Sequence, residues 1–257
     1  MTVRTEPVVV TFSDDTDMTA VALAAAEAAL HGRPLTVLHA SDERAARRAL
    51  TALSDLDASY RRVDDALDEA LIHASRDAFL VVTTADGDRR PGARRVAAHA
   101  ANPTLIASAR QVDASAPVML AVDARHGVPR AGSFAFAEAA ARHVELSVLY
   151  VAREVPDGAF DTVDPFAYDA AAAMEAGDRL LAEALAGYRD TYPDVAVRRR
   201  AWHDPAVVQA IADQAEKAGL LVVATRDHPR MSERLLGSVT AELLGATSCP
   251  LAVVPAR

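Results

Sequence analysis

The residues with the clearest chemical potential lie in and around a polar loop near the end of the chain. An apolar run, Leu220–Ala224, precedes this loop, and Gly237 and Ser238 follow it where a helical pattern begins. Glycine lets a ligand approach the backbone closely, and the free N–H groups of a helix N-terminus attract anions. This arrangement indicates a site for phosphate groups.

Charged side chains within the loop act on such a site in opposite directions. Asp227 at about 5 Å from a phosphate costs roughly 3 kcal/mol at an effective dielectric near 20, more than the ~0.3–1 kcal/mol that an exposed helix dipole returns. Arg226, Arg230 and Arg234 could reverse this balance, because guanidinium groups pair phosphate oxygens two at a time, and Asp227 could also point outward. Two interpretations stay open: a phosphate site, or a vestigial loop in which the Gly-Ser pair only begins a helix.

The loop requires a strand on each side. Leu220–Ala224 and Leu251–Val254 are apolar runs of strand length, typical of strands buried on both faces of a sheet. The connection between them is long enough for the right-handed crossover of a parallel sheet. Open α/β sheets bind ligands outside the carboxyl ends of their strands, which is where this loop is expected.

The same order of strands and helices is expected twice. In the first copy, strands are expected at residues 7–12, 35–40, 60–63, 78–83 and 104–109, with helices at 18–30, 43–53, 66–75 and 94–101, and residues 86–92 form a loop. In the second copy, strands are expected at 117–123, 146–152, 195–202, 220–225 and 250–254, with helices at 133–143, 170–190, 204–218 and after Gly237. We therefore expect two copies of one α/β domain, residues 1–112 and 117–257, joined by a short polar linker. Residues 154–168 are an insertion in the second copy, and a surface loop there could cover a ligand.

Several stretches of the second copy resemble the universal stress protein family. They are Val118-Met-Leu-Ala-Val-Asp123, Leu221-Val-Val-Ala-Thr225, Leu235-Leu-Gly-Ser-Val239 and Cys249-Pro-Leu-Ala-Val-Val254. The resemblance to tandem members of this family extends over both halves. It implies a five-stranded parallel, Rossmann-like sheet of the adenine nucleotide alpha hydrolase type in each half. It also implies a pseudo-dimer joined through the two fifth strands, residues 104–109 and Leu251–Val254.

The resemblance also implies a site for ATP, with Mg²⁺, or for another adenine nucleotide in the second half. The positions that match the family's contacts are Asp123 for the adenosine, Val151 for the base, and Ala224, Arg226, Gly237, Ser238 and Val239 along the phosphate loop. The family pattern has glycine where this chain has Ala224 and Asp227. Only the final Gly-Ser pair of the pattern is therefore retained.

The first copy retains less of the pattern. Ser13 stands where the family has the adenosine Asp, and Asp86 stands where it has the second glycine. A group of arginines, Arg89, Arg90, Arg94 and Arg95, could form an anion patch, although a solvated basic loop is the interpretation that we prefer. We expect the first half to be structural.

Composition narrows the classes of function. The net charge of −9 argues against nucleic acid as a partner, and Arg198, Arg199 and Arg200 are expected on the solvated face of an edge strand. No apolar run approaches the length of a membrane span, and no apolar signal region precedes the first strand, so a cytoplasmic location is expected. Cys249 is the single cysteine and is expected in the core.

Catalytic signals are weak. Lys217 is the single lysine, which excludes a Walker-type phosphate lysine from the loops. His126 and His228 are candidates for a metal or acid/base role, and Asp204 after His203 is better interpreted as a helix N-cap. We therefore expect a stress-response binding or regulatory module and no enzyme. The alternatives are an interaction protein of the same fold without nucleotide, an ATP-dependent enzyme, and further pairing into a homodimer of the tandem chain.

Overall fold

The computed structural model describes residues 5–13, 17–40, 56–85, 90–110, 112–122, 129–152, 170–225 and 236–256. The first half contains β1 (Val8–Phe12), α1 (Met18–Leu30), β2 (Leu35–His39), β3 (Ala58–Arg62), α3 (Leu67–Ala74), β4 (Leu80–Thr84), α4 (Arg90–His99) and β5 (Thr104–Ala107). The second half contains β6 (Val118–Val122), α5 (Pro129–Arg142), β7 (Leu146–Ala152), α6 (Ala170–Leu185), the 3-10 turn η3 (Ala186–Tyr188), β8 (Val197–His203), α7 (Val207–Ala215), β9 (Leu220–Ala224), α8 (Ser238–Ala246) and β10 (Leu251–Val254). The helix expected at residues 43–53 lies outside the described residues.

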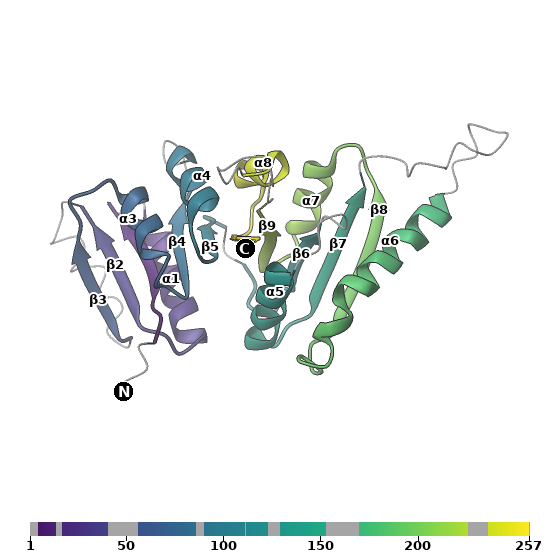
Figure 1. Cartoon of the computed structure of the whole chain (residues 1–257), viewed down its shortest axis with the longest axis horizontal. Coiled ribbons are helices and arrows are strands. Elements are labelled where there is room, and N and C mark those ends of the chain that lie inside the picture. The colour runs from purple at the N-terminus through teal and green to yellow at the C-terminus, as the bar shows by residue number, and fades with distance from the viewer. Residues whose placement is uncertain are drawn as a thin grey trace.

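All of these strands form one ten-stranded sheet in the order β3-β2-β1-β4-β5-β10-β9-β6-β7-β8. Strands within each half are parallel, while β5 and β10 pair in antiparallel fashion where the halves meet. Figure 1 shows the two halves side by side, with the carboxyl terminus at their junction. The duplicated five-stranded fold and the pairing through the fifth strands are therefore confirmed.

The seam between the halves is an apolar strand pair. Leu251 lies opposite Ile106, Ala252 opposite Leu105, and Val253 opposite Thr104. All six residues are buried. Full burial of an aliphatic side chain stabilises a fold by roughly 1.5–3 kcal/mol, so this short pair contributes substantially to holding the halves together.

The hydrophobic core crosses the seam. On one face of the sheet, α1, α5 and α6 cover a single cluster of buried residues that draws on strands of both halves. Alanines explain the close approach of α1, because Ala20, Ala24 and Ala28 recur at helical spacing and are fully or almost fully buried. On the opposite face, α3 and α4 cover the first half while α7 and α8 cover the second.

Hydrogen bonds across the junction add to the apolar contacts. Ser108 donates its hydroxyl to the carbonyl of Ser248 at 2.5 Å. Arg110 donates to the carbonyls of Glu216 at 2.6 Å and Ala218 at 3.3 Å, and so satisfies carbonyl groups at the end of α7. The residues next to the linker thus fix the second half against the first.

Several element boundaries differ from the sequence expectation: the helix expected at residues 133–143 begins at Pro129, and the helix expected at 204–218 spans only Val207–Ala215. The helix expected at residues 94–101 begins at Arg90, so residues 90–92 form its first turn instead of a loop. Proline fits the first helical turn because the N–H that it lacks has no partner there. The helix expected at residues 170–190 ends at Leu185 and continues as a 3-10 turn.

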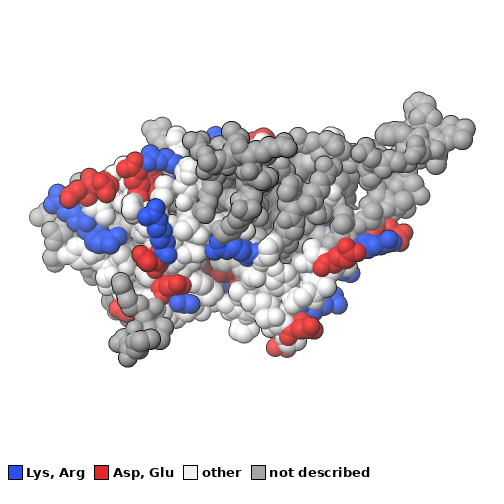
Figure 2. All heavy atoms as spheres, viewed as in Figure 1, with Lys and Arg blue, Asp and Glu red and all other residues white. Residues whose placement is uncertain are grey.

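The outer strands of the sheet are polar. Arg198, Arg199 and Arg200 of β8 are exposed, as expected, and Arg198 pairs with Glu145 at 3.3 Å. Such charges discourage pairing with the edge of another sheet. Figure 2 shows acidic and basic side chains interspersed over the described part of one face. Among the described helices, none has the length and apolarity that crossing a membrane would require.

Candidate functional site

The strand order reverses beside β6, and this is where the candidate site lies. From β6 the chain moves outward to β7 and β8, then returns to β9 on the other side of β6. In open α/β sheets, ligands bind at such a reversal, outside the carboxyl ends of the strands. Ala224 is the last residue of β9, and the position of Asp123 directly follows β6.

The N-terminus of α8 is held over the end of β9. Gly237 is the N-cap residue, with φ −57° and ψ 150°, and the exposed Ser238 begins the helix. Thr240, in the first turn, is buried, and its hydroxyl lies 3.5 Å from the carbonyl oxygen of Ala224. This contact places the Gly-Ser pair beside the strand end, as the βαβ pattern predicts.

Gly237 offers the helix no capping side chain. Among the described residues, no N-cap side chain bonds to the N–H groups in the first turn of α8, and such groups can donate to an anion. The φ of Gly237 is one that any residue adopts, so its backbone conformation does not require glycine.

The chain leaving β9 is anchored before it enters the loop. The N–H of Thr225 donates to the carbonyl of Val254 at 2.9 Å, and the hydroxyl of Thr225 accepts the N–H of Ala256 at 3.0 Å. The start of the loop is thus fixed by the segment that follows β10.

Two of the candidate residues are half-buried valines. Val151 near the end of β7 and Val239 in α8 each pack against the hydrophobic cluster on the α7 and α8 face of the sheet. Asp123, Arg226, Asp227, Arg230 and Arg234 lie outside the described residues, as do His126, His228 and residues 154–168.

The corresponding region of the first half is occupied by internal contacts. Both the N–H and the hydroxyl of Ser13 donate to Asp17 Oδ2, at 2.6 and 2.7 Å. Arg95 pairs with Asp68 at 3.2 Å and Glu69 at 2.5 Å, so carboxylates of α3 already engage it. The guanidinium of Arg90 lies over Gly245 of α8. Arg94 is exposed, Asp86 and Arg89 lie outside the described residues, and an anion patch is not favoured.

Two other residues that the sequence singles out have structural roles. Asp204 was expected to be an N-cap, but Ala206 holds that position and Asp204 Oδ1 accepts its N–H at 2.8 Å in the turn before α7. This expectation was wrong because the carboxylate of Asp204 closes a local turn onto the N–H two residues later, and the helix begins only after that turn, at Val207. Cys249 is buried in the core, and burial raises the pKa of its thiol to about 11.

The sequence reasoning missed two buried polar features. One is His39 at the end of β2, whose ring nitrogens have no hydrogen-bond partner among the described residues. The other is a cluster of four residues that joins the two halves: Glu27 of α1 and His31, the residue that follows this helix, with Glu138 and Arg142 of α5. Both helices carry glutamate followed four residues later by a basic side chain, and this repeated spacing is the signal that could have revealed the cluster.

The fold is that of a tandem α/β protein with a parallel, Rossmann-like sheet of five strands in each half. The family model described as "Universal stress protein family" matches residues 115–255. The chain belongs to the universal stress protein family.

Relatives support this placement. A universal stress protein of Mycolicibacterium smegmatis is 35% identical over 146 residues, which cover 56% of this chain and 47% of that protein. Universal stress protein Rv2623 of Mycobacterium tuberculosis is 31% identical over 196 residues, covering 72% of this chain and 62% of that protein. The chain thus spans roughly half to three fifths of the length of these relatives.

Solved structures show the same fold over nearly the whole chain. The putative universal stress protein from Pseudomonas aeruginosa UCBPP-PA14 superposes with a TM-score of 0.66 at 18% identity, covering 98% of this chain and 93% of that one. A universal stress protein from Archaeoglobus fulgidus DSM 4304 gives a TM-score of 0.63 at 14% identity, covering 97% and 98%.

Proposed function

We propose that this protein is a non-catalytic binding module whose second half binds an adenine nucleotide, with ATP and Mg²⁺ as the first ligand to test. The observation that supports this most is the position of Gly237 and Ser238, at the start of α8 and beside the end of β9. In this proposal residues 117–257 form the binding domain and residues 1–112 the structural domain.

The proposed contacts follow from the chemistry of each residue. The N–H groups of the Gly237–Ser238 turn and the hydroxyl of Ser238 would donate to phosphate oxygens at the positive end of the α8 dipole. Val151 and Val239 would pack against the base or ribose. Asp123 would accept a ribose hydroxyl, and Arg226 would pair with phosphate.

Ala224 marks a departure from the family pattern. Its methyl group packs against the core while its carbonyl faces Thr240, so the strand end is fixed without the freedom of glycine. A ligand would therefore have to fit the loop with less backbone adjustment there. This favours a weaker site than the full glycine pattern would provide.

The described residues at this edge fit binding better than catalysis. They contribute valine, alanine, glycine and hydroxyl side chains, and these groups do not form the pair of acid and base that general acid–base chemistry requires. We accordingly assign no catalytic residue.

Calorimetric titration of ATP and Mg²⁺ into the purified chain tests the proposal. We expect saturable binding of one nucleotide per chain in the wild type. Gly237→Val should weaken binding at least tenfold, because its branched side chain blocks approach to the backbone, whereas the φ of Gly237 allows valine without strain. Ser13→Asp is the control in the first half and should leave the nucleotide affinity unchanged, although it places a second carboxylate beside Asp17 and should lower the free energy of unfolding.

Absence of binding at millimolar nucleotide in the wild type would contradict the proposal. The alternative, an interaction protein that acts through its surface, would then be preferred. Equal nucleotide affinity of the wild type and Gly237→Val would show that the nucleotide does not bind at the N-terminus of α8.

A further inference from the structure

A buried polar cluster joins the two halves on the side of the sheet covered by α1 and α5. Glu27 and His31 lie four residues apart near the end of α1, and Glu138 and Arg142 lie four residues apart near the end of α5. α5 runs back from the carboxyl end of β6, so its C-terminal end, which carries Glu138 and Arg142, lies away from the candidate nucleotide site at that strand end.

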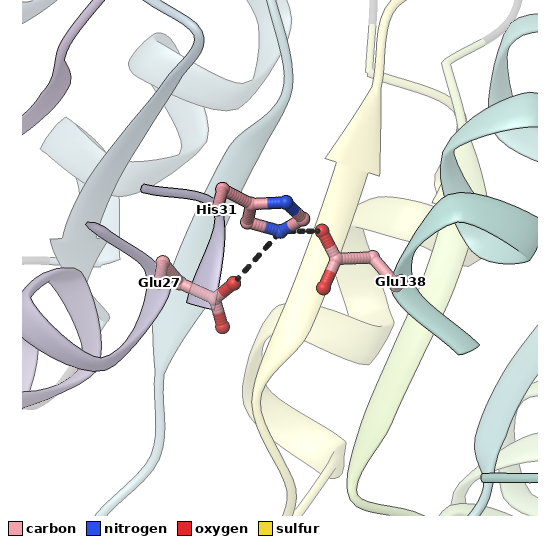
Figure 3. A group of neighbouring side chains, drawn as sticks. All are labelled: Glu27, His31 and Glu138. Carbon is pink, nitrogen blue, oxygen red and sulfur yellow. Dashed lines mark hydrogen bonds and ion pairs between the residues drawn. The ribbon is translucent and has the colours of Figure 1, made fainter. Parts of the chain in front are cut away.

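Three donor atoms in this cluster converge on one point. His31 Nε2 lies 2.9 Å from Glu138 Oε1 and 3.7 Å from Glu27 Oε2. Figure 3 shows the imidazole between the two carboxylates. All three atoms fall within 4.8 Å of one another. Zinc–nitrogen and zinc–oxygen bonds of about 2.0–2.2 Å place neighbouring ligand atoms about 3–4 Å apart, so small side-chain adjustments would suffice.

Arg142 orients both carboxylates by donating to the oxygen of each that does not face His31. It donates to Glu27 Oε1 and, at 2.9 Å, to Glu138 Oε2. Each glutamate therefore has one oxygen on the guanidinium and the other directed toward His31. Metal sites use such outer hydrogen bonds to fix the orientation of their ligands.

With a neutral imidazole the cluster would lack one positive charge, because two carboxylates would then oppose a single guanidinium. Both glutamate side chains are almost completely buried. Glu27 Oε2 is buried and has no hydrogen-bond partner among the described residues. Buried polar atoms normally have partners, because an unpaired charge away from water is costly. His31 Nε2 lies 3.7 Å from this oxygen, and a cation between the two atoms would give the oxygen a close partner.

We propose that Glu27, His31 and Glu138 bind one divalent transition-metal ion that joins α1 to α5, with zinc(II) as the best fit. One imidazole and two carboxylates suit zinc, whereas magnesium and calcium prefer oxygen ligands alone. The side chain of His31 is 12% exposed, which gives an ion a route from solvent and leaves room for a water ligand. The alternative is that the cluster binds a proton in place of a metal ion.

The test uses the full untagged chain, stripped with a chelator and titrated calorimetrically with ZnCl₂ in the absence of nucleotide. We expect one zinc ion per chain and a rise of several degrees in Tm. His31→Gln and Glu138→Gln should each weaken binding at least tenfold, on the order of the loss that perturbed metal sites show. The same separation of glutamate and histidine occurs at Glu69 and His73 on α3, where Glu69 pairs with Arg95, so Glu69→Gln is the matched control.

Cobalt(II) absorption gives a second readout, which reports on the coordination of the ion as well as on binding. Intense visible bands in the wild type, lost in His31→Gln, would support a histidine-ligated site of low coordination number. Wild-type protein that binds neither ion at micromolar concentration would overturn the proposal in favour of the proton. Equal zinc binding by wild type and His31→Gln would overturn it too.

Discussion

Ile106 of β5 and Leu251 of β10 are partners in an antiparallel strand pair, although 145 positions separate them along the chain. Every other strand pairing in the described sheet is parallel. Antiparallel pairing of the two fifth strands relates the halves by an approximate two-fold axis. Each half thereby covers an apolar edge that it could not cover by itself.

Residues 1–112 expressed alone should therefore associate or aggregate. Removal of the second half exposes Leu105 and Ile106 on an open strand edge and opens the core beneath α1. Sedimentation or light scattering measures the outcome. A first half that stays soluble and strictly monomeric would show that the seam is dispensable and would count against this account.

Close packing of α6 on β8 gives a second prediction. A Cβ at Gly177 would lie 2.7 Å from the Cβ of Ala201 and 3.3 Å from the ring of Tyr150. Gly177→Ala should lower the free energy of unfolding by about 1–3 kcal/mol because of overpacking, despite the better helix propensity of alanine. Denaturant unfolding measures this.

Gly187→Ala is the matched control, since a Cβ there meets nothing within 4 Å. It should be neutral or stabilising by up to about 1 kcal/mol. Equal effects of the two substitutions would mean that α6 lies farther from β8 than described.

The thiol of Cys249 should be unreactive in the folded protein at neutral pH. Burial raises its pKa from 9.0 to about 11, although the charge of Arg110 opposes the shift. The chain has one cysteine, so labelling by a thiol reagent reports on this site alone. At about pH 8 we expect slow labelling of native protein and rapid labelling in denaturant, since only the thiolate reacts. Rapid stoichiometric labelling of native protein would contradict the burial of this residue.

The same shift sets a pH dependence of stability. The pKa of the Cys249 thiol is higher in the folded state than in the unfolded chain. The contribution of the neutral thiol to the free energy of unfolding is therefore intact below pH 9 and is lost as the pH rises through about 11. The stability of the wild type should therefore fall more steeply than that of Cys249→Ala across this range. Urea unfolding curves measured at several pH values provide the comparison. If the free energy of unfolding falls equally with pH in the two proteins, the pKa of the Cys249 thiol is not raised by folding.

Much of the fold could be predicted from the sequence. Strands such as Leu220–Ala224 are continuous apolar runs, because both faces of a parallel strand are covered by helices. Repetition of the pattern indicated the duplication, and the family resemblance supplied the joining of the fifth strands. The start of α4 was missed because Pro91 and Gly92 are typical of loops, yet proline also fits a first helical turn.

The candidate nucleotide site could be predicted only in part. The Gly-Ser start of α8 was evident from spacing, and Ala224 and Thr240 meet there as the pattern requires. The seam cluster could not be placed, because Glu27 and Glu138 are 111 positions apart and each resembles an ordinary polar residue on an alanine-rich helix. Only the pairing of the two halves brings those carboxylates together.

Asp227 is the most consequential departure from the family pattern in the loop before α8. If the site binds ATP, Asp227→Gly should tighten binding by tenfold or more. It removes a like charge worth roughly 3 kcal/mol at close range and restores a backbone that can adopt positive φ. Calorimetric titration of wild type and variant measures the difference. Unchanged affinity would mean that the carboxylate points away from the phosphates.

A crystal structure of the chain grown with ATP and Mg²⁺ tests the nucleotide proposal most directly. The proposal predicts phosphate oxygens within hydrogen-bond distance of the N–H groups of Gly237 and Ser238, and a base near Val151, in the second half. A crystal saturated with ATP that shows the N-terminus of α8 without phosphate, or the nucleotide bound only elsewhere on the chain, would contradict it.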